Sequence, residues 1–378
     1  MFSQCAGIYR KSAVMGLRNP RKWLPVSVPD RTLFHRLFRM PMNHKEHTPL
    51  GWPRPQGLWR PSQEKDACGV GFICHLKGRR SHSIIGKTLE MNVSMDHRGA
   101  LGADPATGDG AGVFLQMPDK FLRKEMAKQG VTLPPEGDYG AGIVFLSPTT
   151  GEREAALQLI EHIVREEGQE FLGWRKVPQN SAILGKMSGE YEPVMKQIFI
   201  GKVGDFPSPL EWERKLYVIR RRIVNAIRDN EVPKQLFDVH GNTSRHFPGG
   251  DYVYLPSLSG RTMVYKGMLS PCQLADYFPD FHDSDFETAL ALMHTRFSTN
   301  TFPSWPRSHP NRYMAHNGEI NTIMGNENFM KARQELCKSE AFGRKLSKVL
   351  PVINEDGSDS ARFDNALEFL HMGGYDLT

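Results

Sequence analysis

The amino-acid composition of the chain changes at the stretch CGVGFICHL, residues 68–76. It is a short apolar run with β-branched residues, and such runs are typical of strands. The chain before it is rich in basic residues and proline, whereas the chain after it alternates apolar runs with turn signals. We therefore expect the folded part to begin at Cys68, with a strand at its start.

The basic charge of the chain lies in its first sixth. The 378 residues include 48 Lys and Arg and 42 Asp and Glu, a net charge of +6. Residues 1–65 hold 12 of the basic and 3 of the acidic residues, which leaves 36 basic and 39 acidic residues for 66–378. A near-neutral body argues against a nucleic-acid-binding face. Because no apolar run reaches about 18 residues, we also expect no membrane insertion.

The first 67 residues have the composition of a targeting segment followed by a linker. Residues 1–29 contain five basic residues and no acidic one, and they lack the apolar core of a secretory signal. We expect 1–40 to be a transit-like leader for a mitochondrion or plastid, with a disordered basic leader on a cytoplasmic protein as the alternative. Five prolines between 41 and 61 predict that 41–67 is an extended linker or propeptide.

Strands and helices alternate irregularly in the rest of the chain. Helices are predicted near 84–96, 119–128, 152–167, 271–278, 320–337 and 360–371. Strands are predicted near 68–76, at the end of 97–117, and near 140–147, 196–202, 214–224, 251–257, 262–267 and 288–298. Several strands are neighbours in sequence, which favours an α/β fold of the α+β type, with antiparallel sheets, over a doubly wound parallel sheet. The chain stops at Thr378, directly after a helix and a GlyGly pair, so we expect its C-terminal part to be incomplete.

The five cysteines give no sign of a metal centre. They have no CxxC spacing and no histidine at zinc-finger spacing. A structural zinc site, a disulfide framework and a local iron–sulfur motif are therefore not expected. A reducing compartment is the natural interpretation, and we expect no metal and no cofactor in this segment.

Four segments carry residue types suited to chemistry, and each also has a structural interpretation. They are Cys68 with GlyValGly, the loop HRG…DGAG (97–112), HTRFSTN with AHNGEIN (294–300 and 315–321), and EDGSDS (355–360).

Taken singly, these segments fit ordinary structural roles. Cys68 fits a small buried hydrophobe, and Arg296 fits a surface charge on a strand. AsnGly at 317–318 is a turn signal, and Asp359 suits the N-cap of a helix that begins at Ser360. GDGAG at 108–112 lacks the Lys-Ser/Thr of a phosphate-binding loop.

Taken together, the segments resemble one known family. CGVGF, HRG, DGAG, HTRFST, AHNGEIN and SDS occur in the order seen in class II glutamine amidotransferases, which are N-terminal-nucleophile hydrolases. EKDACGVGF, DHRGALGADPATGDGAG, YKGMLSP and HTRFSTNTFPSWPRSHP resemble, more narrowly, the amidotransferase domain of glutamate synthase large subunits. The resemblance runs from about Lys65 to the C-terminus and identifies 68–378 as the amidotransferase domain. It implies a four-layer αββα fold, truncated at its C-terminus.

The resemblance implies a catalytic set. Cys68 would be the nucleophile, and its own α-amine, freed by cleavage after Ala67, would be the general base. A free thiol with a pKa of about 8.5 is only slightly ionised at neutral pH, whereas an α-amine with a pKa of about 7.7 suits proton abstraction. The Asn317 side-chain amide and the Gly318 backbone N–H match the oxyanion hole. Arg98 matches a position that supports the nucleophile strand.

The resemblance also implies how the substrate is held. Arg296 would bind the α-carboxylate of L-glutamine, because its planar guanidinium can make two parallel hydrogen bonds. Asp359 would bind the α-ammonium group, and Thr299 would be a further hydrogen-bond donor. Some members of the class carry His where this chain has Asn300, and Asn fits the glutamate synthase branch.

The implied reaction is hydrolysis of L-glutamine to glutamate and ammonia through a Cys68 thioester. In a full-length glutamate synthase, synthase domains of the same chain would use the ammonia to aminate 2-oxoglutarate. FMN and an iron–sulfur cluster would lie in the part missing here, and a reductase domain or subunit would be a further partner.

Three alternatives remain open at this point. The first is an amidotransferase domain coupled to amino-sugar, purine or asparagine synthesis. The second is a catalytically silent, unprocessed fragment. The third is a bile-salt-type or penicillin-type amidohydrolase, which would not need the Arg296 and Asp359 pair.

Overall fold

A computed structural model describes residue 57 and residues 69–102, 104–229, 253–298, 302–316, 320–355 and 357–377. Apart from Gly57, these residues belong to one compact unit, Asp66–Thr378. The predicted leader and linker lie outside the described residues, and so do four predicted site residues: Cys68, Thr299, Asn317 and Gly318.

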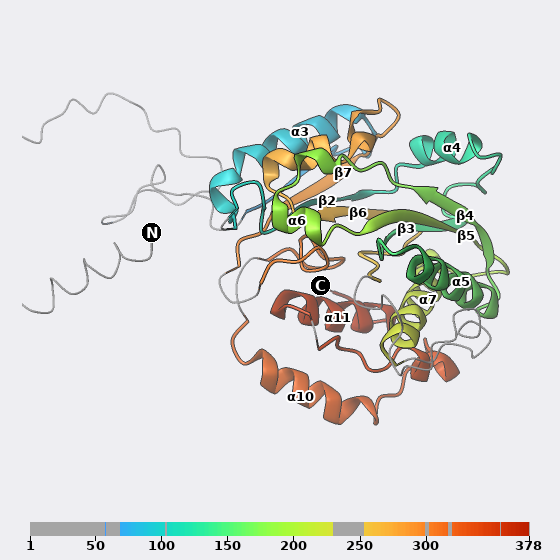
Figure 1. Cartoon of the computed structure of the whole chain (residues 1–378). Helices are drawn as coiled ribbons and strands as arrows, with labels where there is room; N and C mark the ends of the chain where they lie inside the picture. Colours follow the sequence, from blue (N-terminus) through green and yellow to red (C-terminus); the bar gives the residue numbers. More distant parts are fainter. Residues whose placement is uncertain are drawn as a thin grey trace, which may run out of the picture. The chain divides into compact units, whose positions relative to one another are not determined.

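The first sheet has four antiparallel strands in the order β1-β7-β2-β6 (Figure 1). They are β1 (Val70–Cys74), β7 (Leu290–Thr295), β2 (Ala111–Gln116) and β6 (Thr262–Gly267). Helix α3 (His82–Ser94) packs against β1 and β7, and buries Ile84 and Ile85 in the same apolar core as Met293. The predicted strand at 68–76 is confirmed in β1. Its partner β7 ends within the HTRFST segment, and β2 begins within the DGAG segment, so this sheet brings three of the four segments together.

The second sheet has three antiparallel strands in the order β3-β5-β4. They are β3 (Tyr139–Leu146), β5 (Val194–Gly201) and β4 (Glu170–Lys176). Helices α5 (Thr150–Glu166) and α7 (Pro209–Asp229) share an apolar core with alternate residues of β3 and β5, such as Val144 and Ile198. The intervening residues, such as Phe145 and Phe199, join the core of the first sheet. The sequence pattern did not predict β4.

The C-terminal region is helical. Helix α10 (Ile323–Gln334) is followed by the 3₁₀ turn η7 (Gly343–Lys348) and by α11 (Asp359–Met372). Helix α11 contacts α7, and Phe369 and Met372 share an apolar core with Tyr217. Figure 1 shows α10 and α11 on the side of the molecule away from α3. The remaining helices are short: α4 (Asp119–Ala127), α6 (Lys186–Glu190), α9 (Leu274–Tyr277), and the 3₁₀ turns η2 (Asp96–Arg98), η3 (Ser181–Ile183), η5 (Pro271–Gln273) and η6 (Pro279–His282).

An ion cluster around the buried carboxylate of Glu167 ties α5, α7 and η7 together. The carboxylate of Glu167, at the end of α5, pairs with Lys215 at 2.7 Å, with Arg222 at 2.9 Å and with Lys348 at 2.7 Å. Burial would raise the pKa of Glu167, but the hydrogen bonds and charges of the two lysines outweigh it and lower the pKa to about 2. The cluster therefore stabilises the folded state wherever Glu167 is ionised.

The predicted strand at 214–224 is wrong, because these residues lie within helix α7. The run contains Tyr, Val and Ile, which favour strands. However, Trp212, Leu216, Ile219, Ile223 and Ile227 enter the core shared with α5 at the spacing of one helix face. The predicted strand at 251–257 is also wrong in its described part, where Tyr254 makes only an isolated bridge to Phe145. The residues at 271–278 form a 3₁₀ turn followed by a single short helix rather than one helix.

The mixed α/β class with antiparallel sheets is confirmed. The four-layer αββα arrangement stays a prediction. Among the described residues, no helix is both long and apolar enough to span a membrane.

Candidate active site

The start of β1 is locked against the end of β7. The Thr295 N–H donates to the Gly69 carbonyl at 2.7 Å. A Cβ atom at residue 69 would lie 2.5 Å from the Thr295 carbonyl oxygen and 3.2 Å from Cβ of Arg98. Glycine is therefore required at 69, and the residue that follows Cys68 is fixed beside Thr295 and Arg98.

The HRG turn returns the chain to the end of β7. Residues 96–98 form the single 3₁₀ turn η2 directly after α3. The Ala100 N–H then donates to the Arg296 carbonyl at 3.3 Å, and the Asp109 N–H donates to the Ala100 carbonyl at 2.9 Å. The structure thus places Arg98 beside Gly69, and Asp109 beside Arg296, near the end of β7.

Arg296 is buried in an ion pair rather than being a surface charge. Its exposed fraction is 2%, and that of Asp109 is 5%. Its Nη1 donates to the Asp109 carboxylate, and also to the Asp109 carbonyl at 3.3 Å. Burial lowers the pKa of the Arg296 guanidinium and raises that of the Asp109 carboxyl, and each charge opposes the shift of the other. The structural interpretation of Arg296 as an exposed strand charge is therefore wrong.

Gly110 supports this pair through its backbone. Its carbonyl accepts the Arg296 N–H at 2.8 Å. Its φ is 144°, and a Cβ atom there would lie 2.9 to 3.0 Å from atoms of Ser308. Only glycine meets both conditions without strain.

The N-terminus of α11 holds the AHNGEIN segment on both sides of residues 317–319. Asp359 accepts the Ile320 N–H at 3.1 Å through Oδ2. Ser360 donates its hydroxyl to the His316 carbonyl at 3.1 Å. The expected N-cap role of Asp359 is wrong: Ser358 is the N-cap and accepts from Ala361 N–H, and Asp359 is the first residue of the helix. Its side chain is therefore available to bind a segment outside the helix.

His309 packs against the start of β2 and against the ring of His294. Its carbonyl lies over β2, where a Cβ atom at Gly112 would come within 2.5 Å of it. Its ring is 4.5 Å from that of His294. Burial, together with the charges of His294, Lys266, Arg296 and His316, lowers the pKa of His309 well below its ordinary value. We therefore expect His309 to be neutral at neutral pH.

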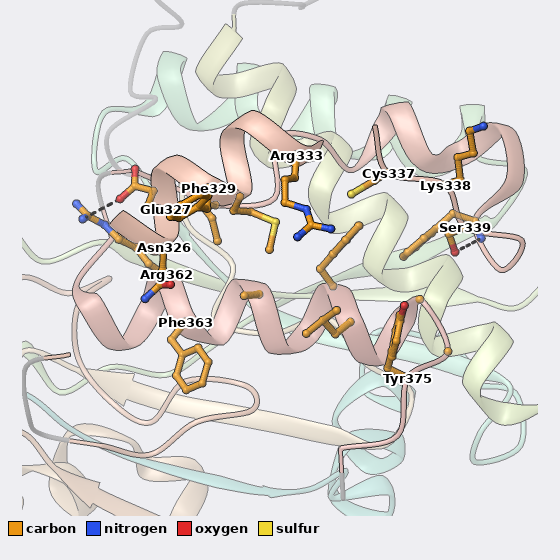
Figure 2. A pocket seen from close by; sticks show the side chains of 18 of the residues that line it. Asn326, Glu327, Phe329, Arg333, Cys337, Lys338, Ser339, Arg362, Phe363 and Tyr375 are labelled. Atoms are coloured by element: carbon orange, nitrogen blue, oxygen red, sulfur yellow. Dashed lines mark hydrogen bonds and ion pairs between the residues drawn. The ribbon is translucent and has the colours of Figure 1, made fainter. Parts of the chain in front are cut away.

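A separate cavity of ≈ 1070 Å³ lies between α10 and α11 (Figure 2). Its lining is mostly apolar, and Figure 2 shows Arg333 between the two helices and Glu327 joined to Arg362. Arg98, Asp109, Arg296 and Asp359 do not line it. Two of the charged residues in its lining, Glu327 and Arg362, pair with each other at 3.1 Å and therefore do not offer a separate cation and anion to a free amino acid.

The described residues contain no group of three or more His, Cys, Asp or Glu side chains placed to hold a metal ion. Cys74 and Cys272 are free and exposed, and Cys337 is free and half-buried. The FMN and iron–sulfur predictions concern a region outside this chain and stay predictions.

Two residues of this region were not assigned a binding role from the sequence. No contact was expected of Asp109 from the sequence, and Ser360 was expected only to begin a helix. Both residues lie in motifs already singled out in the sequence, Asp109 in DGAG and Ser360 in SDS. Neither motif shows which distant backbone its side chain contacts. The roles of Cys68, Arg98, Arg296, Thr299, Asn317, Gly318 and Asp359 in catalysis or binding stay predictions.

The comparisons with known proteins agree on one family. Residues 68–378 match the family described as glutamine amidotransferases class-II. The chain is 47% identical over 322 residues to the NADPH glutamate synthase large chain of Bacillus subtilis, covering 85% of this chain and 20% of that protein. It is 42% identical over 330 residues to the NADH glutamate synthase of Schizosaccharomyces pombe, covering 85% of this chain and 14% of that protein. The chain is 36% identical over 311 residues to the ferredoxin-dependent glutamate synthase 1, chloroplastic/mitochondrial, of Arabidopsis thaliana, covering 82% of this chain and 18% of that protein.

The chain thus spans a fifth or less of the length of these relatives. The family match covers most of the chain and begins at Cys68. The chain belongs to the class-II glutamine amidotransferases.

Proposed function

We propose that this chain is the glutamine amidotransferase domain of a glutamate synthase, and that it hydrolyses L-glutamine to glutamate and ammonia. The observation that carries the proposal is the bond between Gly69 and Thr295. This bond holds Gly69, the residue after Cys68, beside Thr295, the residue before Arg296. The chain is also a member of this family. A nucleophile and a carboxylate-binding cation would then approach the same small molecule.

The chemistry we propose begins at Cys68. Cleavage after Ala67 turns its amide nitrogen into an α-amine, which takes the thiol proton as the sulfur attacks the side-chain carbonyl of glutamine. The tetrahedral oxyanion receives hydrogen bonds from Asn317 and Gly318. Ammonia leaves with a proton from the α-amine, and water hydrolyses the Cys68 thioester to release glutamate. Before cleavage the nitrogen is an amide and cannot accept a proton, so the leader would keep the site inactive.

The charged ends of the substrate would be held by opposite charges. Arg296 binds the α-carboxylate, with Thr299 as an additional donor, and Asp359 binds the α-ammonium group. The contact of Asp359 with Ile320 supports this arrangement, because it ties the ammonium site to the segment that carries the oxyanion donors.

The wider role is also part of the proposal. The ammonia would pass to synthase domains of the same full-length chain, which would use FMN, an iron–sulfur cluster and electrons from a reductase domain or subunit. The fold would be the four-layer αββα arrangement of N-terminal-nucleophile hydrolases. The basic composition of residues 1–40 supports delivery to an organelle.

Ammonia release from L-glutamine tests the proposal directly. The wild-type chain, once processed to begin at Cys68, should release ammonia, and Cys68→Ala should abolish the release. Cys74→Ala is the matched control, because Cys74 is a free, exposed cysteine at the end of β1, six residues after Cys68, and it should keep full activity. Equal release by Cys68→Ala and wild type would contradict the proposal. A wild-type chain that stays unprocessed and inactive would instead favour a silent fragment.

A further inference from the structure

We propose that Asp109 is the positioning residue of the substrate-carboxylate site. It would set the direction of the Arg296 guanidinium and the path of the backbone that leads to Thr299. This inference rests on the proposed glutaminase function and names a residue that acts through Arg296 rather than on the substrate.

The two carboxylate oxygens of Asp109 have different partners. One oxygen accepts Nη1 of Arg296, and the other accepts the Ser298 N–H at 2.6 Å. A single buried side chain therefore fixes both the predicted carboxylate-binding cation and the residue directly before Thr299. The backbone around it is also held, because Arg296 N–H donates to the carbonyl of Gly110.

The contact with Asp109 constrains the guanidinium without using all of its donors. Arginine has five N–H donors on three nitrogens in one plane, and Asp109 is contacted through Nη1. Holding that one nitrogen restricts how the guanidinium can turn, and so helps to set the direction in which its plane meets a carboxylate. Two parallel hydrogen bonds to a carboxylate require that alignment.

The charge of Asp109 matters as much as its shape. Arg296 is buried, and the positive charge of Arg307 acts on it as well. An uncompensated cation at this depth would turn toward water or other acceptors. Asp109 keeps the guanidinium in place before the substrate arrives, so less ordering is needed when glutamine binds.

The test uses Asp109→Asn in the full chain, after mass spectrometry has verified processing at Cys68. Asparagine keeps the shape and one acceptor for Ser298, but it loses the charge that pairs with Arg296. The matched control is Asp104→Asn, in the same loop. Among the described residues, Asp104 accepts from Ala106 and Thr107 of its own loop and from the Lys186 N–H at 2.6 Å.

Two substrates separate positioning from general damage. L-Glutamine has the α-carboxylate, whereas L-glutaminamide replaces it with an uncharged amide. For Asp109→Asn we expect KM for glutamine to rise about 10- to 100-fold, the range for a lost hydrogen bond to a charged group. The kcat should stay nearly unchanged, and KM for glutaminamide should hardly move. Asp104→Asn should leave the ratio of the two KM values at the wild-type value.

The double variant provides the decisive comparison. If Asp109 acts through Arg296, then Asp109→Asn should add almost nothing to the KM of Arg296→Lys. A full additive effect, an unchanged KM for glutamine, or an equal rise for both substrates would overturn the inference. If Asp109→Asn does not fold, Asp109→Glu replaces it, with the same selective rise in KM expected from a displaced charge. A wild-type chain that is processed at Cys68 but inactive would overturn the proposed function instead.

Discussion

Glu368 offers a sharp test of how α11 is anchored, and therefore of how Asp359 at its start is placed. Its carboxylate lies between two buried guanidinium groups: it pairs with Arg220, and with Nε of Arg312 at 2.9 Å. Arg312 also pairs with Asp364, another residue of α11, at 2.7 Å. The exposed side-chain fractions are 6% for Glu368 and 2% for Arg220. Burial would raise the pKa of Glu368, but the two arginines outweigh it and lower the pKa.

The substitution Glu368→Gln keeps the shape and removes the charge. Two opposite charges about 4 Å apart attract by ~4 kcal/mol at an effective dielectric constant of ~20. Most of that attraction is offset by the cost of burying the charges. Removing one partner leaves the arginines with less compensation, and such losses cost about 3–5 kcal/mol of unfolding free energy. We therefore expect Glu368→Gln to lower the unfolding free energy by about 3–5 kcal/mol.

The assay is urea unfolding followed by tryptophan fluorescence and by circular dichroism, whose midpoints should coincide if unfolding is two-state. The control is Glu335→Gln, an exposed glutamate at the end of α10, which should change stability by less than about 0.5 kcal/mol. A loss below about 1 kcal/mol for Glu368→Gln would refute the reasoning, because the buried pair would then be worth no more than a surface one.

Three further predictions follow from single contacts. The pKa of Glu167 is depressed to about 2 in the folded state. Glu167 therefore contributes ~3 kcal/mol to the unfolding free energy above pH ~4.5, and this contribution is lost as the pH falls toward ~2. Urea unfolding at several pH values should show this loss in wild type and not in Glu167→Gln. Ser360→Ala removes the hydroxyl that holds the AHNGEIN segment, and steady-state kinetics should show kcat for glutamine falling about tenfold with KM little changed. Gly110→Ala should destabilise the chain by at least ~1–3 kcal/mol, whereas Gly86→Ala in α3, where a Cβ atom meets nothing within 4 Å, should be neutral or stabilise it by up to ~1 kcal/mol in thermal unfolding.

Local patterns predicted most elements that are apolar on one face or throughout. Helix α5 has one apolar face, and strands β3, β5 and β7 are short, largely buried apolar runs. Part of helix α7 was predicted as a strand, because its Tyr, Val and Ile residues favour strands. The helical spacing of its core residues becomes visible only when the structure shows which residues enter which core. The edge strand β4 was missed because most of its residues are only partly buried, which leaves a weak apolar signal.

The motifs identified the regions of the candidate site but not their contacts. Arg296 and Asp359 were chosen for their charge and for their place in family motifs. The pairing of Arg296 with Asp109, 187 residues earlier, is a product of the β2–β7 register. The bond between Ser360 and the carbonyl of His316 likewise depends on where α11 packs. Such contacts across the fold require tertiary structure, because no local spacing encodes them.

The most direct measurement is mass spectrometry of the processed chain, quenched in acid during turnover of L-glutamine and then digested. The account predicts an N-terminal peptide that begins at Cys68 and carries a glutamyl group in thioester linkage, and predicts that this adduct is lost after hydroxylamine treatment. An N-terminal peptide that begins upstream of Cys68 while ammonia is released, or a glutamyl adduct on another residue, would contradict it.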